Sequence, residues 1–203
     1  MLENQMMLLA VFERAALMLM TLFLLTRTRP FQRLFQKRDH TPAELLLVAA
    51  IFGLFAVFST YTGIPVEGAL INVRIIAIIS GGILFGPWVG IPAGVISGLH
   101  RYLIDMDGHT SIPCLIASII AGLLATWLHL RCRKSRLWLY GILAGMACEG
   151  LTMLLIWQLT EPHAVGVEIV SHIAYPMIAG ALCIGLIIKL VQDLDDEKEL
   201  IAA

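Results

Sequence analysis

Long apolar segments separated by short polar ones run along the whole chain. A membrane-spanning helix needs about 20 mainly apolar residues to cross a hydrocarbon core of about 30 Å. Five segments approach or exceed this length, at residues 6–26, 45–61, 112–130, 137–160 and 169–191. The pattern therefore predicts five spanning helices, with a kink at Pro176 in the last of them.

Residues 72–101 form two shorter apolar arms around a break at Gly86-Pro87. Each arm has roughly 15 residues, or about 22 Å as a helix, which is short for a full crossing. We expect a helical hairpin, made either of two tilted spans or of a re-entrant loop shielded by other helices. In both cases the chain returns to the side that it left, so Arg74 and Arg101 should lie near one membrane face. Two guanidinium groups at one hairpin mouth suit a small anion.

Glycine recurs at every fourth position from the break onward, which places these residues on one face of a helix. Small residues on one face let the backbones of membrane helices approach closely. The stripe therefore predicts a packing seam, formed by Gly86, Gly90, Gly94 and Gly98.

Two basic loops set the expected topology. Residues 27–42 and 131–136 carry most of the arginine and lysine outside the helices, and such loops stay in the cytoplasm. Residues 63–68, 105–111 and 161–168 are then outer turns or loops. The predicted fold is an all-α integral membrane bundle of about seven apolar segments, including the short glycine-rich hairpin, with its N-terminus outside and its C-terminus inside.

Composition agrees with a membrane protein, because the 203 residues are 59% hydrophobic and only 14% charged. The histidines include no H-E-x-x-H, and the sequence has no P-loop, nucleophile elbow or dinucleotide fingerprint. We therefore expect no enzyme activity, metal or cofactor in this chain. The cysteines are too far apart for a zinc site and favour small apolar core positions: Cys114, Cys132, Cys148 and Cys183.

Several polar residues fall at the predicted outer ends of their segments and outline a cup that faces the periplasm. The candidate ligand-binding residues are Arg74, Arg101, Cys114, Ser118 and His172. Three further ionisable residues lie deeper in apolar segments, where they need partners on other helices or across a dimer. Their roles stay open: Glu13, Arg14 and Glu149.

Residues 72–101, followed by Ile112-Pro113-Cys114, resemble the LytS-type (5TM-LYT) membrane sensor region, and the resemblance extends over nearly the whole chain. Within that family, three stretches look especially like the pyruvate-sensing YpdA-type histidine kinases. These are RAALM at 14–18, VEGALINVRIIAIISGGILFGPWVGI at 66–91 and HRYLID at 100–105.

The resemblance implies a receptor for pyruvate or a similar small carboxylate, in which arginines matching Arg74 and Arg101 and a cysteine matching Cys114 contact the ligand. One position departs from the pyruvate sensors, because Ala117 stands where they tend to carry a hydroxyl, and Ser118 follows it.

The resemblance also implies a sensor half, with a membrane-embedded domain at residues 1–191 and the start of a cytoplasmic signalling helix at residues 192–203. The expected partners are a second copy in a homodimer, a cytoplasmic kinase region and a response regulator. The expected location is the bacterial inner membrane.

Two other functions remain open at this point. The glycine-rich hairpin also looks, more distantly, like the substrate-binding membrane subunits of energy-coupling-factor transporters, and broken helices often mark transport sites. A purely structural role would instead pair Arg74 and Arg101 with Glu67 and Asp105.

Overall fold

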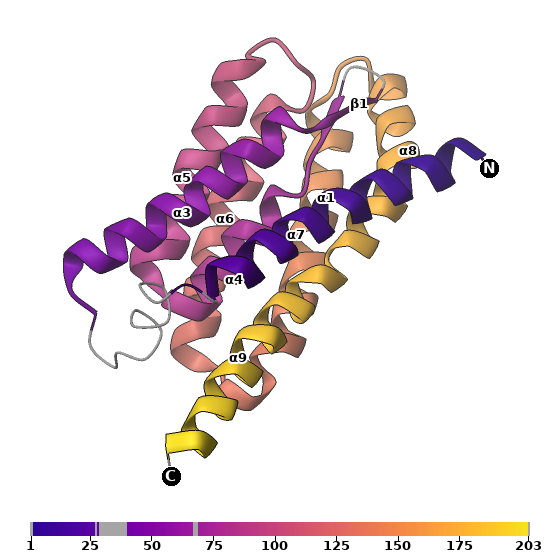
Figure 1. Ribbon diagram of the computed structural model, residues 1–203. Coiled ribbons are helices and arrows are strands. Elements are labelled where there is room, and N and C mark those ends of the chain that lie inside the picture. The colour runs from indigo at the N-terminus through magenta and orange to yellow at the C-terminus, as the bar shows by residue number, and fades with distance from the viewer. Residues whose placement is uncertain (1, 27, 29–39, 67–68, 203) are drawn as a thin grey trace.

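The computed structural model describes residues 2–26, 28, 40–66 and 69–202, and these residues form a helical bundle with one small β-hairpin (Figure 1). The elements in chain order are α1 (Leu2–Thr26), α3 (Pro42–Tyr61), β1 (Ile64–Val66), β2 (Ala69–Ile71), α4 (Arg74–Phe85), α5 (Pro87–Ile104), α6 (Ser111–Arg131), the short 3₁₀ helix η1 (Lys134–Arg136), α7 (Leu137–Leu159), α8 (His163–Gly180) and α9 (Leu182–Ala202). The all-α bundle is confirmed in this part of the chain.

Helix α4 lies at the centre of the bundle and contacts α3, α5, α6, α7 and α9. Every residue from Arg74 to Ile83 is buried, which explains why this segment is apolar almost throughout and lacks a polar face. Its isoleucines Ile78, Ile79 and Ile83 are fully shielded. Because α4 begins with Arg74, the central helix carries a charged residue into the interior at one end of the bundle.

The predicted break at Gly86-Pro87 is confirmed. Gly86 has a φ of 78°, a conformation that a residue with a Cβ rarely adopts, and Pro87 occupies the first turn of α5. The side chain of His129 on α6 covers this turn, with its Nδ1 2.8 Å from the carbonyl oxygen of Ile83. The two arms are less equal than expected, with 12 residues in α4 and 18 in α5.

The glycine stripe is confirmed as a packing seam between α5 and α6. A Cβ built on Gly94 would lie 2.6 Å from the carbonyl oxygen of Ser118, and one on Gly98 would lie 3.0 Å from that of Leu115. Gly90 fits as closely, since its Cβ would come within 2.8 Å of the Cα of Gly82 on α4. At this seam the backbones of α4, α5 and α6 are in contact. This close packing holds the first half of α6 beside Arg74.

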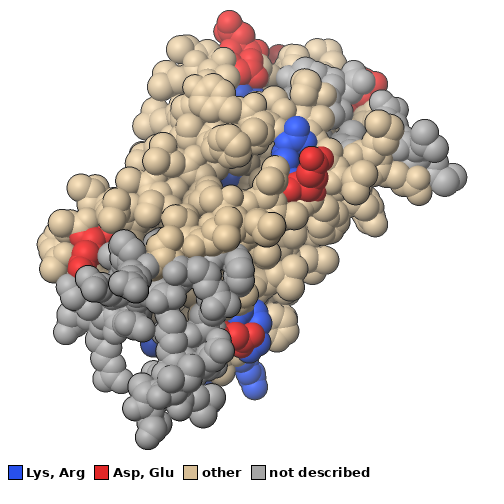
Figure 2. Space-filling view, viewed as in Figure 1, with Lys and Arg blue, Asp and Glu red and all other residues tan. Residues whose placement is uncertain are grey.

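Four described helical segments are long and apolar enough to cross a membrane: Pro42–Tyr61, Ser111–Arg131, Lys134–Leu159 and His163–Asp193. Large apolar side chains point outward from the bundle, as on a surface that faces lipid. Leu46 is 72% exposed and Trp88 70%. The face shown in Figure 2 is mostly tan and carries charged side chains at only a few places.

One predicted boundary needs correction. Helix α8 begins at His163, so residues 163–168 form its first turns and are not part of a loop. The last span is divided between Gly180 and Leu182, where the Ala181 N–H bonds to the Ile178 carbonyl at 3.2 Å, and the kink at Pro176 stays a prediction. The ring of Pro176 removes one helical N–H donor, and α8 continues past it for one further turn.

The predicted outer turn at residues 63–68 includes strand β1, and no strands were predicted from the sequence. Strands β1 and β2 pair antiparallel, with Ile64 opposite Ile71 and Val66 opposite Ala69. The hairpin satisfies backbone groups in the connection between α3 and α4.

The order of the elements places loop 105–110 and the α7–α8 connection at one end of the bundle (Figure 1). The hydroxyl of Thr160 donates to the carbonyl of His109 at 3.4 Å, which joins these two connections. The side chain of Gln192 on α9 donates to the Lys134 carbonyl in η1 at the opposite end. Which end faces the cytoplasm stays a prediction, and most of the basic loop 27–42 lies outside the described residues.

Candidate functional site

A buried guanidinium group forms the centre of the candidate site. Arg74, the first residue of α4, is only 2% exposed. Its Nε donates to Ser118 Oγ at 2.9 Å and its Nη2 donates to the Cys114 carbonyl at 3.4 Å. Its Nη1 has no hydrogen-bond partner among the residues that the structure describes. A buried charged donor without a partner is costly, so Arg74 is poised to bind an acceptor.

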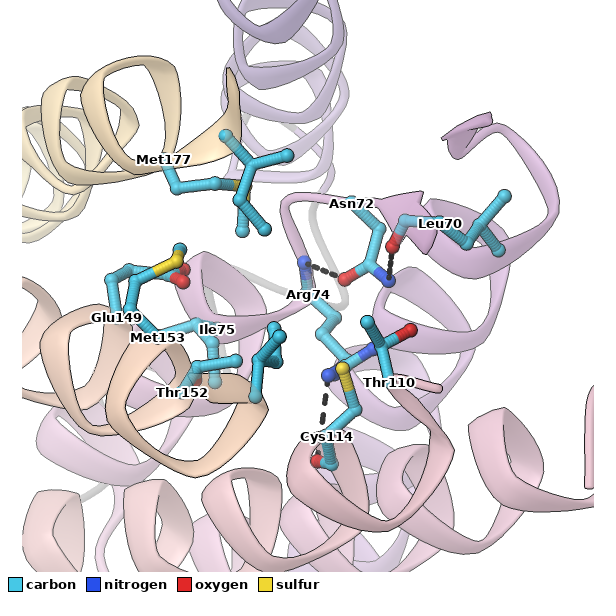
Figure 3. A pocket seen from close by; sticks show the side chains of 12 residues that line it. Leu70, Asn72, Arg74, Ile75, Thr110, Cys114, Glu149, Thr152, Met153 and Met177 are labelled. Atoms are coloured by element: carbon cyan, nitrogen blue, oxygen red, sulfur yellow. Dashed lines mark hydrogen bonds between the residues drawn. The ribbon is translucent and has the colours of Figure 1, made fainter. Parts of the chain in front are cut away.

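Arg74 lines a small cavity between α4, α6, α7 and α8 (Figure 3). The cavity has a volume of about 20 Å³, which is room for one water molecule. Its lining residues are Leu70, Asn72, Arg74, Ile75, Thr110, Cys114, Glu149, Thr152, Met153, Ile156, Ile173 and Met177.

The cavity has a polar and a more apolar side. Figure 3 shows Asn72, Arg74, Thr110 and Cys114 on one side, where the amide oxygen of Asn72 accepts from the Arg74 backbone N–H at 3.4 Å. On the other side, α7 and α8 contribute Glu149 and mainly apolar side chains. One polar group on that side is already used, because the Thr152 hydroxyl donates to the Cys148 carbonyl of its own helix at 2.8 Å.

Arg101 lies behind this cavity and is not among its lining residues. It is fully buried, and its Nη2 donates to Thr110 Oγ1 at 2.8 Å and to Asp105 Oδ2 at 3.1 Å. Its Nε and Nη1 have no partner within the described part of the chain. Thr110, which lines the cavity, therefore links Arg101 to the cavity wall, and both arginines donate to residues at or near the start of α6.

The structure brings Ser118 to the site but gives it an indirect position. Its hydroxyl accepts from Arg74 and donates to the Cys114 carbonyl at 2.7 Å, so it orients the guanidinium group. Ala117 is fully buried in the core. His172 is not brought to the cavity, and its Nδ1 lies 2.9 Å from the carbonyl oxygen of Glu168 in the preceding turn of α8.

Sequence reasoning missed most of the α7 wall of the cavity. Glu149, whose role was left open, is 4% exposed, and its Oε2 has no hydrogen-bond partner among the described residues. The available signal was an acidic residue in the middle of an apolar segment, which marks a functional candidate in a membrane helix. Asn72 and Thr110 gave no comparable signal, because single polar residues at helix ends are common.

A second and larger cavity of about 330 Å³ lies between α1 and α3, and Val73, next to Arg74 in the chain, contributes to its wall. Phe55 and Phe58 contribute to its walls, together with Glu13 and Arg14. Arg14 is only partly buried and its Nη1 donates to the Ala10 carbonyl of its own helix at 3.4 Å. The smaller cavity is the better ligand candidate, because it contains buried polar atoms that lack partners.

Together these features define a multi-pass membrane protein with a small polar cavity inside one end of its bundle. The family described as "5TMR of 5TMR-LYT" matches residues 28–194, and the chain belongs to this family. This confirms the resemblance to the LytS-type sensor region and agrees with a location in the bacterial inner membrane.

Three relatives illustrate the similarity. The chain is 59% identical over 197 residues to the sensor histidine kinase YpdA of Escherichia coli K12, which covers 97% of this chain and 35% of the relative. It is 30% identical to the sensor protein LytS of Bacillus subtilis 168 and 31% identical to the sensor histidine kinase BtsS of Escherichia coli K12. Each of these two matches covers 83% of this chain and 31% of the relative. The chain thus spans about a third of the length of the curated relatives that it matches.

Proposed function

We propose that this chain is the receptor region of a two-component sensor histidine kinase and that it binds extracellular pyruvate or a similar small carboxylate. The carboxylate binds Arg74, and the signal passes through the last helix to a cytoplasmic kinase region. The observation that carries the proposal is the free Nη1 of Arg74, buried in the wall of a cavity. The names of the relatives, which are sensor proteins and sensor histidine kinases, support the receptor role.

The chemistry of the cavity fits a ligand with a carboxylate at one end. A guanidinium group that is held by Ser118 and the Cys114 carbonyl presents its remaining N–H donors in a fixed plane, as carboxylate recognition requires. The Cys114 side chain supplies a small, weakly polar surface beside it. Arg101 places a second positive charge near the cavity, since it donates to Thr110 in the cavity wall. Its unpartnered Nε and Nη1 can reach a ligand if the Thr110 side chain changes rotamer.

A three-carbon acid does not fit in a space of about 20 Å³, so binding requires side chains to move. Met153 and Met177 are the natural candidates, because unbranched methionine side chains rearrange at low cost. Met177 lies on α8, one turn before the interruption that leads into α9.

We propose that displacement of Met177 shifts α8 against α7 and that α9 transmits this shift. The suggested boundary between membrane domain and signalling helix, at residues 191 and 192, lies inside continuous helix α9. A continuous helix transmits a rotation or translation along its axis, and a homodimer would provide the second copy against which that movement is sensed.

A transporter subunit is the alternative function, and the discontinuous α4–α5 hairpin is the feature that favours it. The family membership favours the receptor function. The two functions differ in one measurable respect, because a receptor releases its ligand on the side from which it entered. Reconstituted vesicles that accumulate labelled pyruvate would support transport.

The direct test is calorimetric titration of the purified chain, in detergent or nanodiscs, with pyruvate and a panel of small carboxylates. We expect saturable binding of pyruvate with one site per chain and weaker binding of uncharged analogues such as pyruvamide. A chain that melts cooperatively but binds none of the panel would refute the proposal.

A further inference from the structure

The cavity next to Arg74 contains a carboxyl group that the proposed function does not use. Glu149 reaches it from α7, opposite the side formed by Arg74 and Cys114 (Figure 3). Its side chain is buried, and its Oε2 lacks a hydrogen-bond partner in the described part of the chain. The Arg74 Nη1 in the same cavity also lacks one. Two unpartnered polar groups in opposite walls of one cavity suit a ligand with two different polar ends.

The charge state of Glu149 decides whether an anion enters. If the carboxyl group were ionised, the incoming carboxylate would meet a like charge in a space shielded from water. For two unit charges about 5 Å apart at an effective dielectric constant near 20, such repulsion weakens binding by roughly two- to three-hundredfold. A neutral carboxylic acid removes the repulsion and supplies an O–H donor.

On the α7 and α8 side of the cavity, the other groups leave this donor role to Glu149. Arg74 is engaged by the carboxylate end of the ligand, and the Thr152 hydroxyl already donates within α7. The remaining walls from α7 and α8 are apolar, with Met153, Ile173 and Met177. A keto oxygen accepts hydrogen bonds and donates none, so on this side it needs a donor.

We propose that Glu149 binds the ligand as a neutral carboxylic acid and donates a hydrogen bond to the keto oxygen of an α-keto acid, while Arg74 holds the carboxylate. This inference rests on the proposed function, since it requires a carboxylate at Arg74. It makes Glu149 the residue that distinguishes an α-keto acid from a simple carboxylic acid of the same length. The proton comes from solvent and stays on Glu149 in the complex.

The inference predicts that binding weakens in alkaline solution, when Glu149 loses its proton. The other titratable groups that face the cavity or adjoin Glu149 are few. Arg74 on α4 stays charged, α6 contributes the thiol of Cys114, and Cys148 precedes Glu149 on α7. The residues of α8 in the cavity wall, Ile173 and Met177, do not titrate.

The experiment measures the dissociation constants of pyruvate and propionate between pH 6.5 and 9.5 for the wild type, Glu149→Gln and Glu149→Leu. For the wild type we expect the constant to rise with pH, by at most about tenfold per unit, as linkage to one proton allows. Glu149→Gln keeps an uncharged donor, so it should bind pyruvate within about threefold of wild type at pH 6.5 and lose the pH dependence. Glu149→Leu should weaken the binding of pyruvate at least tenfold and the binding of propionate much less.

A Cys114→Ser variant serves as the control for the thiol, and it should keep the shape of the pH profile whatever its affinity. If Glu149→Leu does not fold, the pH dependence of pyruvate binding to Glu149→Gln tests the inference by itself. Binding of pyruvate that is independent of pH in the wild type, or an unchanged pH profile in Glu149→Gln, would overturn the inference alone. A wild type that binds no carboxylate at any pH would refute the proposed function and this inference with it.

Discussion

Replacement of Arg74 by alanine tests the central feature of the site. The change removes the Nε bond to Ser118, the Nη2 bond to the Cys114 carbonyl and the free Nη1 that we assign to the ligand. Truncating one partner of a buried, hydrogen-bonded charge pair costs about 2–5 kcal/mol. At about 1.4 kcal/mol per decade, pyruvate binding should weaken roughly 30-fold to several-thousand-fold.

The fold should tolerate this change. Ser118 keeps a partner in Arg74→Ala, since its hydroxyl still donates to the Cys114 carbonyl at 2.7 Å. The substitution also removes a buried guanidinium nitrogen that has no partner, which offsets part of the lost bonding. We therefore expect a small change in melting temperature beside a large change in affinity.

Arg74→Lys refines the test, because an ammonium group keeps the charge but loses the planar fork. It cannot hold Ser118 and a carboxylate in the same geometry, so its affinity should fall between those of wild type and Arg74→Ala. The matched control is Arg133→Ala, which removes an exposed arginine between α6 and η1 and should leave binding unchanged.

The assay is calorimetric titration of pyruvate alongside melting curves in the same detergent. Unchanged affinity in Arg74→Ala would refute the reasoning. A large loss of melting temperature with unchanged affinity would instead support the purely structural role of the arginine.

Three further predictions follow from the packing and the topology. Arg101→Ala should lower both pyruvate affinity and melting temperature, because it removes the hydrogen bonds that Arg101 donates to Asp105 and Thr110. A variant in which neither quantity changes would contradict this. Gly94→Ala should lower the melting temperature, since its Cβ would lie 2.6 Å from a carbonyl oxygen. The control is Gly150→Ala, whose Cβ meets nothing within 4 Å and which should be neutral or slightly stabilising; equal effects would argue against the seam. In intact cells, on a cysteine-free background, a membrane-impermeant thiol reagent should label a cysteine at position 107 and not one at 134; the reverse pattern would invert the topology.

Much of the fold could be predicted because it depends on local patterns. The helix break at Gly86 follows from a backbone conformation that glycine adopts readily, and the seam at Gly94 follows from helical spacing. The division between α8 and α9 was not predicted, whereas the helix continues past Pro176 as a kinked helix would.

The candidate site was predictable only in part. Arg74, Cys114 and Ser118 were found because they lie near the ends of segments that the hairpin brings together. His172 was expected beside them at the same depth, but its Nδ1 faces a carbonyl of its own helix. Depth along a helix can be estimated from sequence, whereas the direction in which a side chain points depends on the rotation of that helix.

The sequence by itself determined the membrane-embedded bundle, the hairpin and the presence of buried charge, since hydrophobicity and glycine spacing act over a few turns of one helix. Only the tertiary structure decided that Arg74 and Glu149, on α4 and α7, share one cavity while Arg101 donates to Thr110 in its wall. Apolar burial favours many arrangements of helices almost equally. The choice among them depends on close packing between helices distant in sequence, such as the backbone contact of Gly94 with Ser118.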